Sequence, residues 1–133
     1  MRFVLDASVT ITWAMRDEDH PLADLAFSAL ESGEAIVPAI WWYEIRNILV
    51  LSERRGRIAS DDVIRFLAEL EQLRIEVESP DDSALVLDLA RRHTLSVYDA
   101  AYLALARREH TPLATLDKNL EAAALAAGIA PLM

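Results

Sequence analysis

Four acidic side chains, widely separated in the sequence, occupy positions where together they could bind a metal ion. Asp6 and Asp117 each follow a short apolar run that is typical of a buried parallel strand. Glu44 and Asp99 lie near the starts of two predicted helices. Carboxylate oxygens are hard ligands that suit Mg²⁺ or Mn²⁺ rather than zinc. An ion held in this way activates water for in-line displacement at phosphorus, so the pattern predicts metal-dependent hydrolysis at these residues.

Each acid also has a simpler structural explanation. Ser96 followed three residues later by Asp99 is a capping-box pattern. Asp6 and Asp117 each precede a predicted helix, where aspartate often serves as the N-cap. Glu44 could point to solvent or pair with a neighbouring arginine, although its setting among aromatic and aliphatic residues is unusual for a solvated charge. One shared geometry, in contrast, would account for all four acids.

Strands and helices alternate along the chain, which predicts an α/β fold: a three-layer α/β/α sandwich with a mostly parallel central sheet. In such sheets ligands bind at the edge formed by the carboxyl ends of the strands. The predicted strands span residues 3–5, 34–38, 75–78 and 111–116, with a last edge strand at 129–132. The predicted helices span residues 9–15, 21–32, 39–55, 60–73, 80–93 and 96–106, with a final helix after residue 117. Residues 16–20 are expected to form a polar loop.

Length and composition fit a single domain over residues 1–133. The chain is 53% hydrophobic and contains no cysteine, which excludes disulfides and thiolate metal sites and favours a reducing compartment. None of the 3 histidines has a second ligand at the spacing of a zinc site. The first residues reach Asp6 too soon for a signal-peptide core, and no apolar run is long enough to span a bilayer. We therefore expect a soluble, cytoplasmic protein without a membrane partner.

The charge balance bears on the substrate. A formal net charge of −9 argues against a module that holds nucleic acid by charge alone, but it is compatible with an enzyme whose bound cations supply positive charge. The densest basic cluster ends the helix predicted for residues 39–55, where it either forms a solvated helix terminus or contacts phosphates. The candidates for phosphate contact, chosen by charge, are Arg46, Arg54, Arg55 and Arg57.

Helical periodicity predicts which side chains enter the core. The helix starting at Ser96 places Tyr98, Tyr102 and Leu105 on one face. In the helix predicted for residues 60–73, the spacing assigns to the core Ile64, Leu67, Leu70 and Leu73.

Several short motifs, in their order along the chain, resemble those of PIN-domain nucleases, and most closely those of the VapC toxins of bacterial and archaeal toxin–antitoxin pairs. The motifs are Asp6-Ala7-Ser8-Val9 after the first strand, Glu44 with Asn47, the helix Tyr98-Asp99-Ala100-Ala101-Tyr102-Leu103-Ala104-Leu105-Ala106, and Thr115-Leu116-Asp117. The resemblance covers nearly the whole chain. It implies an Mg²⁺- or Mn²⁺-dependent endoribonuclease that acts on RNA, forms a homodimer and is silenced by a cognate antitoxin whose tail enters the active site.

The resemblance also implies roles for individual residues. The acidic metal ligands would be Asp6, Glu44, Asp99 and Asp117. Three polar residues, Ser8, Asn47 and Thr115, would orient these ligands. Some family members carry another acid two residues after the last motif aspartate, where this chain has Asn119. The number of metal ions, one or two, therefore stays open.

Other functions fit the sequence less well. A haloacid-dehalogenase phosphatase would need an acid where Ser8 stands, and the chain has no glycine-rich phosphate loop for a nucleotide hydrolase. Two alternatives stay open: a catalytically idle binding or scaffold domain, and a nuclease that processes RNA without being a toxin. Trp41 and Trp42 are expected in the core, with a dimer or antitoxin surface as the alternative.

Overall fold

The computed structural model describes residues 1–15 and 19–133, so part of the loop expected at residues 16–20 lies outside the described residues. Four parallel strands form a sheet with the spatial order β3-β2-β1-β4. The strands are β1 (Arg2–Leu5), β2 (Glu34–Pro38), β3 (Ile75–Glu78) and β4 (Leu113–Ala114). The parallel sheet confirms the predicted α/β class.

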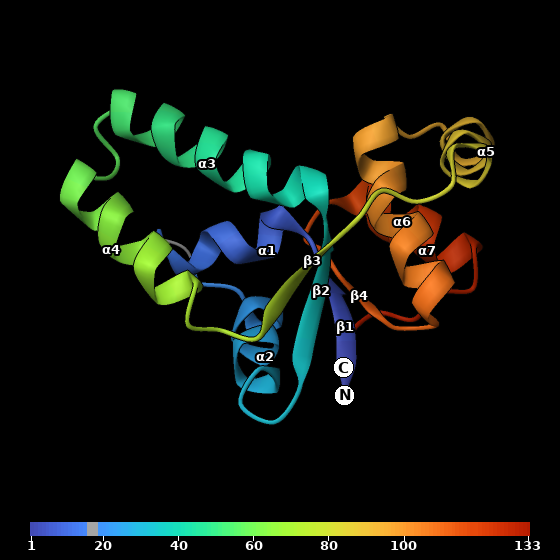
Figure 1. Cartoon of the computed structure of the whole chain (residues 1–133), viewed down its shortest axis with the longest axis horizontal. Helices are drawn as coiled ribbons and strands as arrows, with labels where there is room; N and C mark the ends of the chain where they lie inside the picture. The colour runs from blue at the N-terminus through green and yellow to red at the C-terminus, as the bar shows by residue number, and fades with distance from the viewer. Residues whose placement is uncertain (16–18) are drawn as a thin grey trace.

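Helices cover both faces of this sheet. Figure 1 shows the segments from α1 to α4 on one side of the strands and α5, α6 and α7 on the other, which is the three-layer arrangement expected from the sequence. The helical elements of the described residues are α1 (Ala7–Thr10), the 3-10 helix η1 (Ile11–Trp13), α2 (Pro21–Ala29), α3 (Ala39–Arg54), α4 (Ser60–Leu70), α5 (Ser83–His93), α6 (Val97–Glu109) and α7 (Lys118–Ala126).

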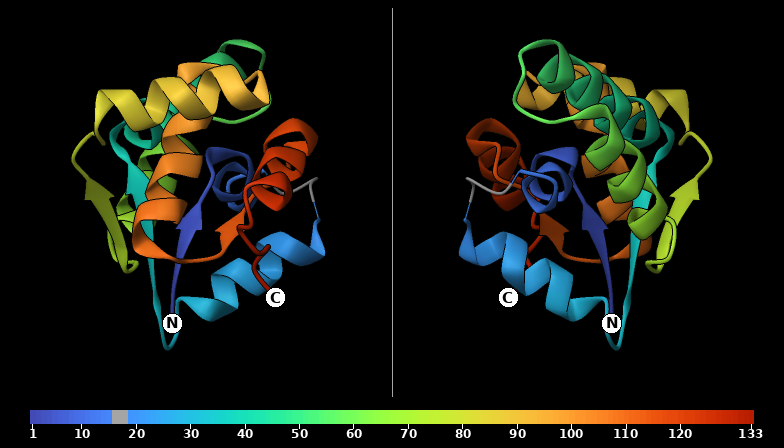
Figure 2. Two further views of the ribbon diagram at one scale, coloured as in Figure 1. Left: turned by 90° about the vertical axis from the view of Figure 1, so that its right-hand side faces the viewer. Right: turned by 90° about the vertical axis from the view of Figure 1, so that its left-hand side faces the viewer.

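The two central strands form the middle of the core because both of their faces are covered. Phe3, Val4 and Leu5 in β1 are fully buried, as are residues 35–37 in β2, which explains their unbroken apolar sequences. Helix α6 packs on this part of the sheet, and its buried Ala100 and Ala104 allow close approach. The left view of Figure 2 shows α6 lying over the sheet, with α5 crossing it.

Short connections bring several helix starts to one edge of the sheet. Asp6 alone separates β1 from α1, and α3 follows directly after the last residue of β2. Pro38 ends β2 and is also the N-cap residue of α3. Asp117 caps α7 three residues after β4 ends. Three of the elements that carry predicted acids, α1, α3 and α7, therefore begin at the carboxyl ends of parallel strands, the edge where open α/β sheets bind ligands. The fourth, α6, carries Asp99 and follows helix α5.

The structure corrects two local predictions and shows how one predicted helix face is divided between core and solvent. The edge strand expected at residues 129–132 is reduced to an isolated parallel bridge between Leu113 and Pro131. Ile64 is 68% exposed, because the buried stripe of α4 runs through Phe66 and Leu70, one helical turn apart. Tyr98 is exposed because it lies in the first turn of α6, before the helix reaches the sheet. Among the described residues, no helix is long and apolar enough to cross a membrane.

Candidate active site

Asp6 is the most buried of the four acids, with 5% of its surface exposed. Its Oδ2 atom accepts hydrogen bonds from Ser8 Oγ at 2.6 Å and from Thr115 Oγ1 at 2.7 Å. Asp6 occupies the N-cap position of α1, but its side chain makes no cap hydrogen bond there. The carboxylate is thus held by two hydroxyl groups from different elements rather than used to cap its own helix.

The same two hydroxyl groups connect the ends of β1 and β4. Ser8 Oγ accepts a hydrogen bond from the backbone N–H of Leu116 at 3.0 Å. Thr115 Oγ1 accepts one from the backbone N–H of Asp117 at 3.0 Å. Because each hydroxyl accepts from the backbone and donates to Asp6, both protons are directed at the carboxylate. These are the contacts expected of groups that orient a ligand.

Asp117 follows β4 and begins α7. Its Oδ1 atom accepts hydrogen bonds from the backbone N–H groups of Asn119 at 2.9 Å and Leu120 at 3.0 Å. The capping explanation of this acid is therefore correct as a description of its local contacts. It does not account for the electrostatic effect of Asp117 on the other acids, because the pKa values of Asp6 and Asp99 are both raised by its charge.

Glu44 is half-buried in the second turn of α3. Its Oε1 atom accepts a hydrogen bond of 2.6 Å from the hydroxyl of Tyr102, a fully buried side chain of α6. The alternative pairing with Arg46 does not occur, since that guanidinium donates to the backbone oxygen of Trp42 and lies 3.7 Å from the centre of its ring. The periodicity of α6 assigned Tyr102 to a packed face, but it did not reveal that its hydroxyl reaches Glu44.

Asp99 lies in the first turn of α6 and is partly buried. Its backbone N–H donates to Ser96 Oγ at 3.1 Å, which is the cap expected from the sequence. Because this hydrogen bond uses the backbone of Asp99, the N-cap does not depend on the carboxylate of Asp99. The side chain can therefore serve a second purpose without loss of the N-cap.

The electrostatics show that the acids influence one another. Burial raises the pKa values of Asp6, Glu44 and Asp99, and the charges of neighbouring acids raise them further. The charges of Asp6 and Asp99 raise the pKa of Glu44. The charges of Asp117 and Asp6 raise the pKa of Asp99. The hydroxyls around Asp6 and the phenol on Glu44 act in the opposite direction, because they donate to the ionised form.

The donor set fits a hard divalent cation. Mutual repulsion among carboxylates that are also partly removed from water is relieved when a bound cation supplies the opposite charge. Carboxylate oxygens are the ligands that Mg²⁺ and Mn²⁺ prefer. Within residues 1–15 and 19–133, no group of three or more acidic or histidine side chains already has the geometry of a metal site. The arrangement is therefore a set of converging acids rather than a completed coordination sphere.

Asn47 lies one turn after Glu44, whereas the basic cluster after it lies apart from the four acids. Asn47 is exposed on α3. Arg54 and Arg55 are exposed at the end of that helix, about 15 Å along its axis from Glu44, at the usual rise of about 1.5 Å per residue. Arg57 lies beyond the helix end and lines a groove. These three arginines are therefore remote in the chain fold from the carboxylate of Glu44.

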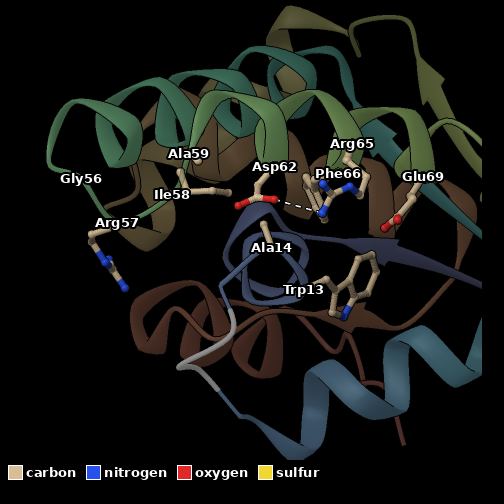
Figure 3. Close-up of a pocket in the computed structure, with 10 residues that line it drawn as sticks. All are labelled: Trp13, Ala14, Gly56, Arg57, Ile58, Ala59, Asp62, Arg65, Phe66 and Glu69. Atoms are coloured by element: carbon tan, nitrogen blue, oxygen red, sulfur yellow. Dashed lines mark hydrogen bonds and ion pairs between the residues drawn. The ribbon is translucent and has the colours of Figure 1, made fainter.

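That groove has a volume of about 490 Å³. Figure 3 shows α4 along one side of it and the η1 segment along another. Trp13 and Phe66 supply large apolar surfaces, whereas Arg57, Asp62, Arg65, and Glu69 supply charged ones. An adjoining hollow of about 360 Å³ extends this surface between α2 and α4. The four acids do not line either hollow.

The two adjacent tryptophans, Trp41 and Trp42, differ in burial. Trp41 is 4% exposed and belongs to the core as expected, whereas Trp42 is 43% exposed. The ring of Trp42 contacts Tyr43 edge-on, with centroids 5.0 Å apart. Assignment of Trp42 to the core is therefore wrong, because successive residues of a helix point about 100° apart and only one of the two can face the sheet.

Comparisons with known proteins agree with this geometry. The sequence profile of the PIN domain matches residues 3–125. Ribonuclease VapC3 from Pyrobaculum aerophilum is 32% identical over 123 residues, which cover 90% of this chain and 92% of that protein.

Solved structures share the fold at lower identity. PAE2754 from Pyrobaculum aerophilum gives a TM-score of 0.72 at 24% identity, covering 92% of this chain and 79% of the other. VapC20 from Mycobacterium tuberculosis gives a TM-score of 0.65 at 15% identity, and the match covers 91% of this chain and 94% of the other. FitAcB from Neisseria gonorrhoeae gives a TM-score of 0.59 at 21% identity, and the match covers 98% of this chain and 96% of the other. With its strand order, its converging acids and a profile match over nearly its whole length, the chain belongs to the PIN-domain family.

Proposed function

We propose that the protein is a divalent-metal-dependent endoribonuclease, with Asp6, Glu44, Asp99 and Asp117 as its metal ligands. The observation that carries this proposal is the electrostatic coupling of the four acids, which come from four separate parts of the chain. Capping accounts for the carboxylate of Asp117 alone and would require no such convergence. Membership of the PIN-domain family and the likeness to Ribonuclease VapC3 support an RNA substrate.

The residues of the site have distinct tasks. Ser8 and Thr115 hold one oxygen of Asp6 in place, so the other oxygen is oriented toward the site. Asp117 is fixed by the backbone amides at the start of α7. A bound Mg²⁺ or Mn²⁺ would activate water and stabilise negative charge on the phosphate. The carboxylates repel the phosphate backbone in the absence of a cation, which makes substrate binding itself dependent on the metal.

We propose further that the protein is the toxin of a toxin–antitoxin pair. Ribonuclease VapC3 shares most of its length with this chain, and VapC20 is described as a toxin that cleaves the sarcin-ricin loop. We propose that the antitoxin tail enters the active site and that another part of the antitoxin contacts the groove in Figure 3, because an apolar centre with a charged rim is the usual anatomy of a protein interface. We also propose that the protein forms a homodimer and acts on RNA in the cytoplasm.

The nuclease proposal is tested by incubating the metal-stripped protein with a pool of labelled single-stranded RNAs, with and without Mn²⁺. We expect cleavage only with Mn²⁺ and its loss in Asp6→Asn. A matched control, Asp88→Asn, changes an exposed acid of α5 that pairs with Arg92, and its cleavage should equal that of the original protein. Cleavage that is equal in EDTA, or that survives in a folded Asp6→Asn variant, would refute the proposal.

The toxin proposal is tested in cells. Expression should arrest growth, and the product of a neighbouring antitoxin gene should relieve the arrest. Filling the groove with Ala14→Trp should abolish this relief while RNA cleavage in vitro continues, because Ala14 lines the groove and not the acid cluster. Growth that is unaffected by an active enzyme would indicate a nuclease that processes RNA without being a toxin.

A further inference from the structure

We propose that Tyr102 is a positioning residue, whose buried hydroxyl fixes the carboxylate of Glu44 in the orientation that the metal requires. The inference rests on the proposed metal function of the four acids. Its basis is the 2.6 Å hydrogen bond from the Tyr102 hydroxyl to Glu44 Oε1, which joins side chains 58 residues apart in the sequence.

Glu44 needs such a contact more than the other three acids do. The three aspartates have short side chains at the starts of helices, and Asp6 and Asp117 are each held by two hydrogen bonds. Glu44 instead projects from the second turn of α3 on a longer side chain with more rotamers to restrict. Among the described residues, the side-chain hydrogen bond of Glu44 is the one from Tyr102. This single contact therefore largely determines the orientation of the Glu44 carboxylate.

Tyr102 is suited to this task because it cannot itself move easily. The side chain has no exposed surface, and α6 packs against the central strands. The same helix carries Asp99 three residues earlier, on the same side of the helix. Thus α6 supplies one acid directly and sets the direction of a second acid from α3. A phenol is a suitable donor here, because its ring packs in the core while its hydroxyl reaches the polar site.

A second contact fixes the helix that carries Glu44. Trp41, three residues before Glu44 in α3, donates from Nε1 to Thr10 Oγ1 at 3.0 Å. Thr10 Oγ1 in turn donates to the backbone oxygen of Asp6 at 3.2 Å. The start of α3 is thereby tied to the residue that anchors the site. With the backbone of α3 fixed in this way, the hydroxyl of Tyr102 determines where the Glu44 carboxylate points.

The test compares Mn²⁺ affinity, measured by calorimetric titration of the metal-stripped protein, among four proteins: the original chain, Tyr102→Phe, Glu44→Gln, and the double variant. Phenylalanine fills the same space and removes only the hydroxyl. We expect Tyr102→Phe to weaken Mn²⁺ binding about ten-fold, the usual effect of losing a group that orients a metal ligand. Tyr98→Phe is the matched control, because Tyr98 lies one turn earlier in α6 and is exposed, and it should leave the affinity unchanged.

The double variant separates positioning from a general structural effect. If Tyr102 acts through Glu44, removing its hydroxyl from Glu44→Gln should cause little further loss of affinity. With RNA and saturating Mn²⁺, Tyr102→Phe should lower kcat and leave the KM for RNA unchanged. A full additive loss in the double variant, or an unchanged affinity in Tyr102→Phe, would overturn the inference.

The failure of this inference is distinguishable from that of the proposed function. If Glu44→Gln loses affinity and Tyr102→Phe does not, the metal site stands and the positioning role is refuted. If Glu44→Gln also binds Mn²⁺ normally, the assignment of Glu44 as a ligand is refuted as well. Should Tyr102→Phe fail to fold, Glu44→Asp replaces it, because a carboxylate shortened by one methylene loses the phenol contact. An affinity equal to that of the original chain in Glu44→Asp would then refute the inference.

Discussion

Replacing Asp99 by asparagine should stabilise the metal-free protein. The partly buried carboxylate faces the charges of Asp117 and Asp6, and burial adds to the cost of its charge. Each pair of like charges in a partly solvated site costs on the order of 1 kcal/mol. Loss of a carboxylate from the first turn of α6 removes about 0.5 kcal/mol of favourable helix-dipole interaction. The repulsion is the larger effect, so we expect a net gain of about 1 kcal/mol.

The gain in stability of Asp99→Asn over the original protein should increase as the pH rises. The pKa of Asp99 is raised in the folded protein, so the folded state binds this proton more tightly than the unfolded state does. Stability is therefore lost as the pH rises from the ordinary carboxyl pKa of about 3.9 through the raised folded-state value. Asp99→Asn avoids that loss. Its advantage should be absent at low pH, where both states of the original protein are protonated, and complete at neutral pH.

Thermal unfolding of the metal-stripped proteins checks this expectation. For a chain of this size, a gain of about 1 kcal/mol corresponds to a rise in Tm of about 3–5 °C. Asp24→Asn is the matched control, since Asp24 lies in the first turn of α2 and tests loss of the helix-dipole term alone. Saturating Mn²⁺ should reverse the order by stabilising the original protein, by about 2.7 kcal/mol at 100 times the Kd. A lower Tm for metal-free Asp99→Asn than for Asp24→Asn would refute the repulsion argument and favour a purely structural role.

Three further changes test other parts of the site. Asp117→Ala and Asp117→Asn should both relieve repulsion with Asp6 and Asp99 in the metal-free protein, but only Asp117→Ala also removes the side-chain cap of α7. Chemical denaturation should therefore find Asp117→Ala about 1 kcal/mol less stable than Asp117→Asn, and equal stability of the two variants would contradict this. Thr115→Val removes the hydroxyl between Asp6 and the backbone of Asp117 and should cost about 2 kcal/mol, which urea unfolding would measure against the conservative Thr115→Ser; wild-type stability in Thr115→Val would show that these hydrogen bonds are dispensable. Combined Arg54→Ala and Arg55→Ala should reduce the slope of log Kd for RNA against log salt by about 1.4, and an unchanged slope would remove both residues from the RNA surface.

The sequence predicts the positions of the acids well because they depend on local rules. A short apolar run reaches Asp6 at the end of β1, and strand–helix alternation places Glu44, Asp99 and Asp117 near helix starts. Parallel pairing then brings the strand ends next to Asp6, Glu44 and Asp117 to one edge of the sheet, whereas Asp99 lies on α6, which follows another helix. None of these steps requires knowledge of how a side chain is oriented.

The contacts between the elements could not be predicted in the same way. The hydrogen bond between Tyr102 and Glu44 depends on how α6 and α3 pack, and neither helix alone determines that distance. The face that α4 turns toward the core could not be predicted either. Periodicity assigned Ile64 to the core, whereas the helix buries Phe66. Residues 129–132 also lacked a deciding signal, because a bridge at Pro131 and a paired strand have similar apolar sequences.

The chemistry of the cleaved RNA tests the central claim most directly. If metal-activated water attacks the phosphorus, the fragments should end in linear phosphates and hydroxyls, and cleavage should persist when the nucleotide at the cut site carries 2′-deoxyribose. Both results should require Mn²⁺ or Mg²⁺ and be lost in Asp6→Asn. Fragments ending in 2′,3′-cyclic phosphate, together with loss of cleavage on 2′-deoxy substitution, would show attack by the RNA's own hydroxyl. That outcome would contradict a four-carboxylate hydrolase.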